Sequence, residues 1–438
     1  MSDPRQLRGE ILAKVAEYYR LAHTNRTFVP GQTRINYGGR VYDERELINA
    51  TEAVLDFWLT AGPRARAFEE RLAGFLGSRH ALALNSGSSA NLVAISALCS
   101  RRLERPLQPG DEVITPATGF ATTVAPIVQN RLVPVFVDCT LGTYNLDPAQ
   151  LEPALSERTR AIFFAHTLGN PVEMDPVLDF AHTYGLYIIE DTCDALGSTY
   201  DGRLVGTFGD MGTLSFYPAH HITTGEGGAL VTDNAMLHRI AESLRDWGRD
   251  CRCQHDSPPE GECGRRFEWD IPGLDEPYDH RYLFVEIGYN LKMTDIQAAI
   301  GLAQLEKLPA FIAARKSNFA RLYEGLKPYE EFLILPVWSE RADPAWFAFP
   351  LTVRPGAPFT RRELTSFLEG RNIETRLLFA GNIVRQPGYR HIEHRVIGEL
   401  VNSNIVLQSS FFIGVYPGLD EARISYMVEA FADFFARL

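Results

Sequence analysis

Short apolar runs alternate with amphipathic segments through the middle of the chain. Seven runs have the length and composition of buried strands: HALALN (80–85), DEVITP (111–116), LVPVFVD (132–138), RAIFFAHT (160–167), GLYIIED (185–191), GTLSF (212–216) and GALVTD (228–233). Segments between them, such as 88–98 and 175–184, carry apolar residues at helical spacing. Strands that alternate with helices predict an α/β fold with a mostly parallel sheet covered on both faces.

The two ends of the chain depart from this pattern. Residues 5–24 and 44–60 have the spacing of amphipathic helices, and a long helical stretch over 296–326 is expected to kink or break near Pro309. The remaining chain mixes strand and helix patterns, as a smaller α+β domain does. The predicted division is an N-terminal helical segment (1–55) packed on the small domain, a large domain (56–310) and a small C-terminal domain (311–438).

Residues 251–280 interrupt the alternation. The segment CRCQHDSPPEGECGRRFEWDIPGLDEPYDH is rich in proline, glycine and charge, which predicts an inserted loop. Long loops inside compact domains are usually functional or disordered. Since three of the six cysteines lie in this segment, a functional role is favoured.

Composition narrows the class of protein. The 438 residues are 45% hydrophobic and 22% charged, as in soluble globular proteins. A net charge of −12 argues against nucleic acid as the main ligand, because phosphate backbones require clustered lysine and arginine. No apolar run reaches the roughly 18 residues that span a membrane, and the start MSDPRQLRGE lacks an apolar signal core. We therefore expect a cytoplasmic protein.

Lysine is scarce, and its distribution limits the chemistry. Of the 43 basic residues only five are lysines: Lys14, Lys292, Lys307, Lys316 and Lys327. No lysine lies between Lys14 and Lys292, so that stretch cannot supply a Schiff-base amine.

Two motifs follow predicted strands. In NSGSSANL (85–92), Gly87, Ser88 and Ser89 would offer backbone N–H groups and hydroxyls at a helix N-terminus, which suits an anion. In IIEDTCDALGS (188–198), Asp191 ends a strand at the edge where parallel sheets bind ligands. Taken singly, the first motif is equally compatible with an ordinary turn before a helix, and the second with a solvated capping acid.

Together the motifs resemble the sugar aminotransferase and dehydratase family (DegT/DnrJ/EryC1/StrS) of fold type I pyridoxal-phosphate enzymes, over nearly the whole chain. The resemblance implies an aspartate-aminotransferase-like, cofactor-binding large domain. It implies the following cofactor contacts: Gly87, Ser88, Ser89 and Ser215 at the phosphate, Phe120 stacked on the ring, Asp191 at the pyridine nitrogen and Asp194 near the ring hydroxyl. It also implies that Asn290, in IGYNLKMTDIQAA (287–299), reaches the phosphate of a neighbouring subunit in a homodimer.

The stretch SFYPAHHITTGEGG (215–228) carries His220 where most members of this family have the cofactor-binding lysine. With FYPAHHIT, RDWGRDC, TRLLFAGN and YPG, it resembles the nucleotide-sugar 3-dehydratases that act on 4-keto-6-deoxyhexoses. The resemblance implies pyridoxamine 5′-phosphate (PMP) held noncovalently, an adduct at C4 of a CDP- or dTDP-linked sugar, and His220 as the base in expulsion of the C3 hydroxyl. The residues do not show which nucleotide is bound, or whether C2 is already deoxygenated. His221 and Arg376 are candidate substrate contacts, and a packed histidine or an inactive relative is the alternative for His220.

Four cysteines, Cys193, Cys251, Cys253 and Cys263, have the spacing C-x57-C-x-C-x9-C. Four thiolates suit zinc or an iron–sulfur cluster, and the spacing alone does not choose between them. Removing the C3 hydroxyl leaves an adduct that needs two electrons, which favours a redox centre over structural zinc. The resemblance likewise implies a 2Fe-2S cluster, reduced by a flavoprotein or ferredoxin-type partner.

Three other functions predict different sequence features. A sugar aminotransferase predicts a lysine near residue 220, which the sequence lacks. A regulator built on this fold requires a DNA-binding module, and the first 55 residues show no basic cluster for one. A 3-dehydratase without a cluster, which restores its cofactor with glutamate, is disfavoured by the four cysteines.

Overall fold

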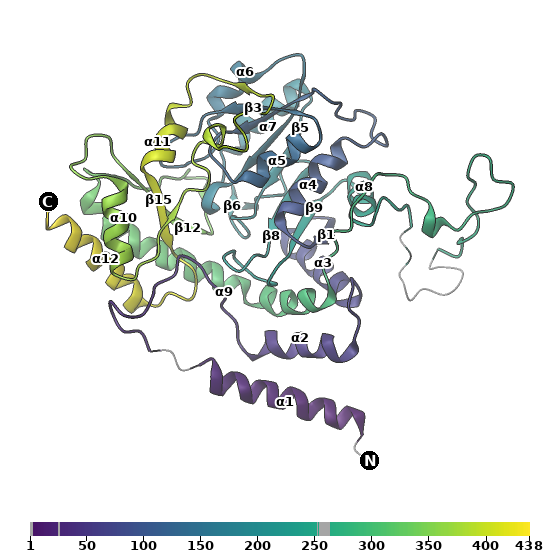
Figure 1. The fold of residues 1–438 in the computed structure, drawn as a ribbon, viewed down its shortest axis with the longest axis horizontal. Helices are drawn as coiled ribbons and strands as arrows, with labels where there is room; N and C mark the ends of the chain where they lie inside the picture. Colours follow the sequence, from purple (N-terminus) through teal and green to yellow (C-terminus); the bar gives the residue numbers. More distant parts are fainter. Residues whose placement is uncertain (1–2, 25–26, 252, 254–262) are drawn as a thin grey trace.

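The computed structural model describes residues 3–24, 27–251, 253 and 263–438. An eight-stranded sheet in the order β1–β9–β8–β5–β4–β2–β3–β14 lies at its centre (Figure 1). Its strands are β1 (His80–Leu84), β2 (Glu112–Pro116), β3 (Val133–Val137), β4 (Thr159–Ala165), β5 (Tyr187–Asp191), β8 (Met211–Ser215), β9 (Gly228–Thr232) and β14 (Arg395–Val396). Only β9 pairs antiparallel, with both β1 and β8. The predicted mostly parallel sheet is confirmed.

Each of the seven predicted runs forms one of these strands. The eighth, β14, comes from the C-terminal region and pairs parallel with β3 at the edge of the sheet. It is only two residues long, which is too short for a strand pattern to show in the sequence.

Alternate residues of the buried strands face opposite helical layers. On β4, Phe163 packs in a cluster with residues of α4 (Gly87–Leu98) and α8 (Ala235–Arg245). Its neighbour Phe164 packs with residues of α6 (Leu151–Ala154) and α7 (Met174–Tyr184). Since successive strand side chains point to opposite faces, one apolar run fills both layers.

The long helix α9 (Asp295–Leu326) is continuous through Pro309, so of the expected kink or break the break is wrong. A proline removes one backbone hydrogen bond, and the buried neighbours Leu308 and Phe311 pack on either side of it. The apolar contacts of α9 therefore continue past the proline. Its first half packs on α3 (Pro63–Leu76), and its second half enters the C-terminal core.

The C-terminal region contains a second, antiparallel sheet in the order β10–β12–β15–β13. Its elements are β10 (Leu333–Ile334), β12 (Ala348–Val353), β13 (Arg376–Leu377), β15 (Ser410–Gly414), α10 (Arg361–Gly370), α11 (Val401–Ser409) and α12 (Glu421–Phe435). A three-stranded sheet, β11–β6–β7, joins β6 (Thr199–Tyr200) and β7 (Arg203–Leu204) to β11 (Ala342–Asp343). This region combines an antiparallel sheet with helices, as the predicted α+β pattern requires.

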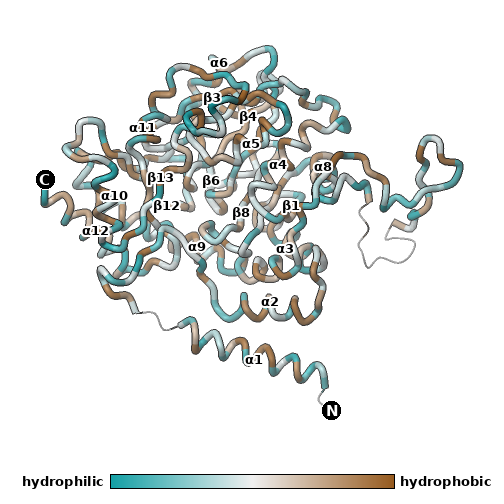
Figure 2. Tube along the Cα trace, viewed as in Figure 1, coloured by the Kyte–Doolittle hydropathy of each residue, from teal (hydrophilic) through white to brown (hydrophobic). Residues whose placement is uncertain are grey.

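The N-terminal helices lie outside α9 (Figure 1). Helix α1 (Pro4–Ala22) packs on α2 (Glu44–Asp56), and Glu46 of α2 accepts hydrogen bonds from Gln304 and Lys307 in the first half of α9. Figure 2 shows hydrophilic and hydrophobic residues mixed along α1. Because Ile35 belongs to the C-terminal core, the first 55 residues contact both regions, and the domain division stays a prediction.

The segment after α8 extends away from the body of the molecule, on the side opposite α10 and α12 (Figure 1). It corresponds to the predicted insertion 251–280, of which residues 252 and 254–262 lie outside the described residues. Among the residues that the structure describes, none of the helices has the length and hydropathy needed to cross a bilayer.

Candidate active site

A cavity of about 390 Å³ opens where the parallel strands end. The predicted site residues that line it are Gly87, Ser88, Phe120, Asp191, Cys193, Asp194, Ser215, His220 and Arg376. They come from the ends of β5 and β8, the starts of α4 and α5 (Ala121–Gln129), the β8–β9 connection and, for Arg376, strand β13. Ligands of open α/β sheets bind at this carboxyl edge.

The start of α4 forms a polar end of the cavity. Ser86 caps the helix, since its Oγ accepts a hydrogen bond from the Ser89 amide at 3.1 Å, and Ser88 Oγ donates to Thr122 Oγ1 at 3.0 Å. A Cβ at Gly87 would lie 2.6 Å from the Ser215 Cβ, so the close approach of β8 requires glycine there. A phosphate fits this end, because unpaired N–H groups and the helix dipole favour an anion. Ser89 itself does not line the cavity.

The carboxylate of Asp191 is buried and firmly oriented at the end of β5. Its Oδ2 accepts hydrogen bonds from Asn91 Nδ2 at 2.9 Å and from Thr123 Oγ1 at 2.8 Å, and its Oδ1 accepts from the Cys193 amide at 3.2 Å. This arrangement fits the protonated pyridine nitrogen of the cofactor, whose acidity a fixed carboxylate lowers. The ring of Phe120, half exposed at the cavity, is held edge-on against Phe379 with 5.8 Å between centroids.

His220 enters the cavity from the β8–β9 connection. Its amide donates to the Tyr217 carbonyl at 2.9 Å, and its carbonyl accepts from the Arg315 guanidinium at 2.9 Å. Arg315 is buried and also donates to the Phe347 carbonyl at 3.0 Å, so it joins the histidine turn to the C-terminal region. The His220 Nδ1 lies 3.4 Å from Asp194 Oδ1 and makes no hydrogen bond within the described part of the chain.

Burial determines the protonation states of His220 and Asp194. It lowers the pKa of His220 to about 3, with the Arg315 charge acting in the same direction. Burial, together with the nearby Asp191 carboxylate, raises the pKa of Asp194 to about 8. Near neutral pH the imidazole is therefore unprotonated and the Asp194 carboxyl is protonated, so the 3.4 Å contact joins two uncharged groups. An unprotonated imidazole can accept a proton from a bound ligand.

The raised pKa of Asp194 predicts a pH-dependent stability of the cofactor-free protein. An unfolded aspartate titrates near 3.8, so above that pH folding takes up a proton and stability falls as the pH rises toward 8. His220 acts oppositely, but only below 6.5, where its unfolded ring becomes protonated. Between pH 6.5 and 8 we expect Asp194→Asn to flatten the fall in melting temperature and to melt several degrees higher at pH 8.

Calorimetry of the cofactor-free protein in half-unit pH steps measures this effect. Asp179→Asn, an exposed change on α7, is the matched control and should keep the wild-type slope. Equal slopes for Asp194→Asn and wild type would show that the Asp194 carboxyl ionises normally in the folded protein.

Of the two predicted substrate contacts, only Arg376 lines the cavity; His221 and the predicted subunit contact Asn290 do not. Arg376 lines the cavity, forms an ion pair with Glu374, and lies over the Tyr37 ring at 4.8 Å. His221 does not line it: the ring is buried and its Nε2 bonds the Ala345 carbonyl. Adjacent side chains of the turn diverge, which directs His221 into the core. Asn290 is exposed and also lies outside the cavity.

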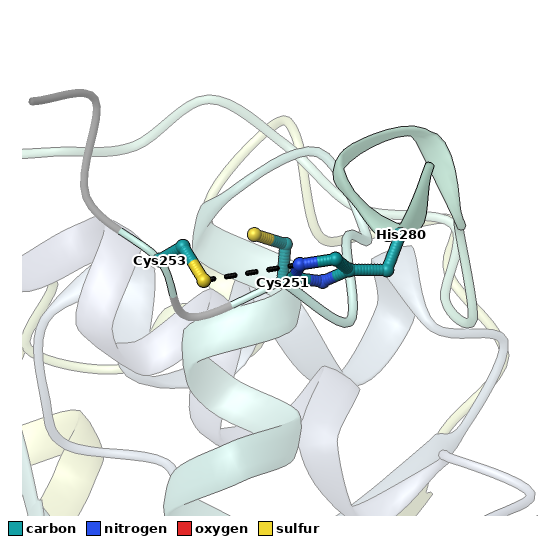
Figure 3. A group of neighbouring side chains, drawn as sticks. All are labelled: Cys251, Cys253 and His280. Carbon is teal, nitrogen blue, oxygen red and sulfur yellow. Dashed lines mark hydrogen bonds between the residues drawn. The ribbon is translucent and has the colours of Figure 1, made fainter. Parts of the chain in front are cut away.

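Cys193 and the predicted cysteine ligands of the 251–280 segment lie in different surroundings. Cys193 lines the cofactor cavity beside Gly87, because it follows the end of β5 directly. Cys251 and Cys253 instead line a second cavity, of about 330 Å³, with Trp247 and Lys292. His280, which the sequence analysis did not select, lies against them (Figure 3). Cys193 thus lines a different cavity from Cys251 and Cys253 in this structure, and the four-cysteine ligand set stays a prediction.

Other residues of the site were also missed from the sequence. Asn91 and Thr123 orient Asp191, and each lies about one helical turn after a selected residue: Asn91 after Gly87 and Ser88 in NSGSSANL, and Thr123 after Phe120. Their helical spacing from the selected residues is the signal that could have identified them. Arg315 and Tyr37 come from distant segments, and no local pattern marks them.

Comparisons with known proteins agree with this site. The DegT/DnrJ/EryC1/StrS aminotransferase family profile matches residues 41–432. The chain is 51% identical over 431 residues to dTDP-4-dehydro-2,6-dideoxy-D-glucose 3-dehydratase of Saccharopolyspora spinosa (98% of this chain, 92% of the relative). It is 50% identical over 430 residues to the lipopolysaccharide biosynthesis protein RfbH of Salmonella typhimurium (98% of each chain).

Among solved structures, GDP-4-keto-6-deoxymannose-3-dehydratase with a trapped PLP-glutamate geminal diamine is similar, with a TM-score of 0.81 and 28% identity over 90% of this chain and 99% of that one. The fold of this chain is that of fold type I pyridoxal-phosphate enzymes, as predicted. Because the family profile spans most of its length and two relatives share about half of its residues, the chain belongs to the DegT/DnrJ/EryC1/StrS aminotransferase family.

Proposed function

We propose that this protein is a C3 dehydratase of a nucleotide-linked 4-keto-6-deoxyhexose. The observation that carries the proposal is His220, an unprotonated imidazole in a cavity that has an anion-binding end and a fixed carboxylate. None of the described residues that line the cavity is a lysine. The base of the reaction is therefore a histidine, and the cofactor is held by noncovalent contacts alone.

The cavity fits PMP by its own chemistry. The close packing at Gly87 leaves room for backbone rather than side chain at the anion end, and the buried Asp191 carboxylate faces the same cavity. Gly87, Ser88 and Ser215 would hold the phosphate, with Ser89 reinforcing the helix cap. When bound, PMP supplies an amine for the C4 carbonyl carbon and a ring that accepts electron density from bonds broken beside it.

The residues of the chain would divide the remaining work. His220 takes a proton from the bound cofactor as the C3 hydroxyl leaves, and the protonated Asp194 beside Nδ1 provides no competing negative charge. Phe120 would stack on the ring, and Arg376 and Tyr37, which also line the cavity, would contact the nucleotide-linked sugar. Arg315 holds the histidine turn in place.

The overall reaction needs reducing equivalents. Replacing a C3 hydroxyl by hydrogen consumes two electrons and two protons and releases one water. We propose that an iron–sulfur centre at Cys193, Cys251, Cys253 and Cys263 receives the electrons from a flavoprotein or ferredoxin-type reductase. The names of the relatives support the substrate class: one acts on a dTDP-linked 4-keto sugar and another on a GDP-linked one.

We also propose a homodimer with shared active sites. Asn290 is exposed beside the second cavity, with its backbone bridged to Asp246. An exposed amide on a rigid segment is suitable for contact with the phosphate site of a second copy. Within its own chain, Asn290 does not reach the cofactor cavity.

The test is an anaerobic assay of the full-length protein with PMP, a panel of CDP-, dTDP- and GDP-linked 4-keto-6-deoxyhexoses, and either a reductase with NADH or glutamate. We expect a 3-deoxy ketosugar nucleotide with one NADH consumed per product, detected by mass spectrometry. Turnover with glutamate alone favours the route suggested by the glutamate adduct of the solved relative. A 4-amino sugar as product would contradict dehydration and indicate transamination.

A further inference from the structure

A row of phenylalanine rings lines one wall of the cofactor cavity. In the order in which neighbouring rings meet, its members are Phe120, Phe379, Phe412 and Phe347. Successive ring centroids are 5.8, 6.0 and 6.1 Å apart, and each pair meets edge to face. This row, here called the aromatic wall, ends against His220, whose ring centroid lies 5.2 Å from that of Phe347. The aromatic wall therefore extends from the residue expected to stack on the cofactor to the expected base.

The middle of the aromatic wall comes from the C-terminal region. Phe412 lies on β15, where its neighbours Phe411 and Ile413 belong to the C-terminal core. Since alternate residues of a strand face opposite sides, Phe412 points out of that core and toward the cavity. Tyr37 also packs edge-on against it, with 5.7 Å between centroids, and only 3% of Phe412 is exposed. The ring is thus held in place from several sides.

Phe379 reaches the aromatic wall through an unusual backbone conformation. Its φ is 49°, in the left-handed region that bulky residues rarely adopt. The turn is held on both sides, since the Phe379 amide donates to the Leu377 carbonyl at 2.7 Å and the Ala380 amide donates to the Gly119 carbonyl at 3.2 Å. Strained residues of this kind cluster at ligand sites, where the surroundings impose the conformation. The turn at Phe379 therefore points to a role for its ring in binding as well as in packing.

The chemistry of the aromatic wall matches one part of the expected substrate. Phenylalanine side chains carry no hydrogen-bonding group, so the wall favours an apolar group. In a 4-keto-6-deoxyhexose the C6 methyl group is attached to C5, directly beside the C4 carbonyl that must approach the cofactor. The C3 hydroxyl lies on the other side of C4, and the nucleotide is attached across the ring at C1. The methyl group is thus the apolar part of the sugar nearest the reacting carbon, and the wall is an apolar surface beside His220.

We propose that the aromatic wall, chiefly Phe379 and Phe412, binds the C6 methyl group and selects 6-deoxy sugars over their 6-hydroxy counterparts. This selection rests on the proposed function and assigns part of its substrate specificity to named side chains. A C6 hydroxyl against the wall would lose its hydrogen bonds to water without a replacement. Apolar pockets reject an added hydroxyl by up to roughly 100-fold.

Affinities for stable, unreactive ligands test this selection. Isothermal titration calorimetry is applied to the full-length protein loaded with PMP, with glucose and 6-deoxyglucose each linked to CDP, dTDP and GDP. These sugars carry a hydroxyl in place of the C4 carbonyl, and the two members of each pair differ only at C6. For the nucleotide that binds, we expect the 6-deoxy sugar to bind roughly 10- to 100-fold more tightly.

A hydroxyl added to the aromatic wall should weaken the preference. In Phe412→Tyr and in Phe379→Tyr, the phenol can form a hydrogen bond with the C6 hydroxyl, so we expect the two sugars to bind with similar affinity. The exposed control Phe57→Tyr should keep the wild-type ratio of affinities. PMP content and melting temperature are measured for each variant. The wild-type ratio decides the question even where a variant fails to fold.

Equal wild-type affinities within each pair would overturn the inference, and so would binding of none of the six ligands. A wild-type ratio kept by both tyrosine variants at normal PMP content would also overturn it. Weaker binding of free nucleoside diphosphate to these variants, with an unchanged sugar ratio, would mean that the wall binds the nucleobase instead. Formation of a 3-deoxy sugar by a protein without preference at C6 would leave the proposed function intact, so the two proposals fail separately.

Discussion

Replacing His220 with asparagine should abolish release of the C3 hydroxyl while leaving the cofactor bound. The imidazole is unprotonated at neutral pH and lies in the cofactor cavity, so it is the base that the geometry supports. Asparagine has similar size but accepts no proton. Since a positioned general base contributes roughly 10²–10⁴-fold to a rate, we expect a loss of that order in single-turnover product formation.

The measurement combines rapid mixing of PMP-loaded variant and 4-keto sugar nucleotide with mass spectrometry of the product. PMP affinity, measured by equilibrium dialysis, should change little, because the phosphate and ring contacts come from other residues. His182→Asn, an exposed change on α7, is the matched control. Wild-type turnover by His220→Asn would mean that another residue is the base. Loss of PMP binding would mean that His220 helps to bind the cofactor.

Much of the fold could be predicted because its strands are buried on both faces. Such strands read as continuous apolar runs, and all seven runs became strands of the central sheet. The antiparallel placement of β9 and the continuity of α9 through Pro309 were not predicted. Both depend on packing between distant segments, which overrides local propensity.

The residues of the candidate site likewise fall into those that the sequence could predict and those that it could not. Gly87 and Asp191 follow strands directly, so sheet topology alone brings them to one edge. His280 and Arg315 act through contacts across long separations, and each looked like an ordinary residue of its segment. Cys193 also follows a strand directly and lines the cofactor cavity, while its assignment to a metal centre, which rests on spacing and resemblance, stays a prediction.

Replacing Asp191 with asparagine should weaken PMP binding and lower the rate. This variant tests the cofactor-binding residues independently of the base. The side chain keeps its shape, so Asn91 and Thr123 can still donate to its oxygen. The change removes the negative charge that would hold a proton on the pyridine nitrogen, and it also replaces the oxygen that accepts from the Cys193 amide by an NH2 group. A hydrogen bond between charged groups is worth about 1.5–3 kcal/mol, which predicts roughly 10- to 100-fold weaker PMP binding.

The rate at saturating PMP should fall further, because a neutral pyridine accepts electron density poorly. Nitrogen-15 NMR of labelled PMP reports the protonation of the ring directly: a protonated nitrogen in the wild type and a neutral one in Asp191→Asn are expected. Asp179→Asn again serves as control and should leave both signals unchanged. A protonated ring nitrogen and a wild-type rate in Asp191→Asn would mean that another acid performs this task, and that the cofactor does not lie across the cavity between the start of α4 and the end of β5.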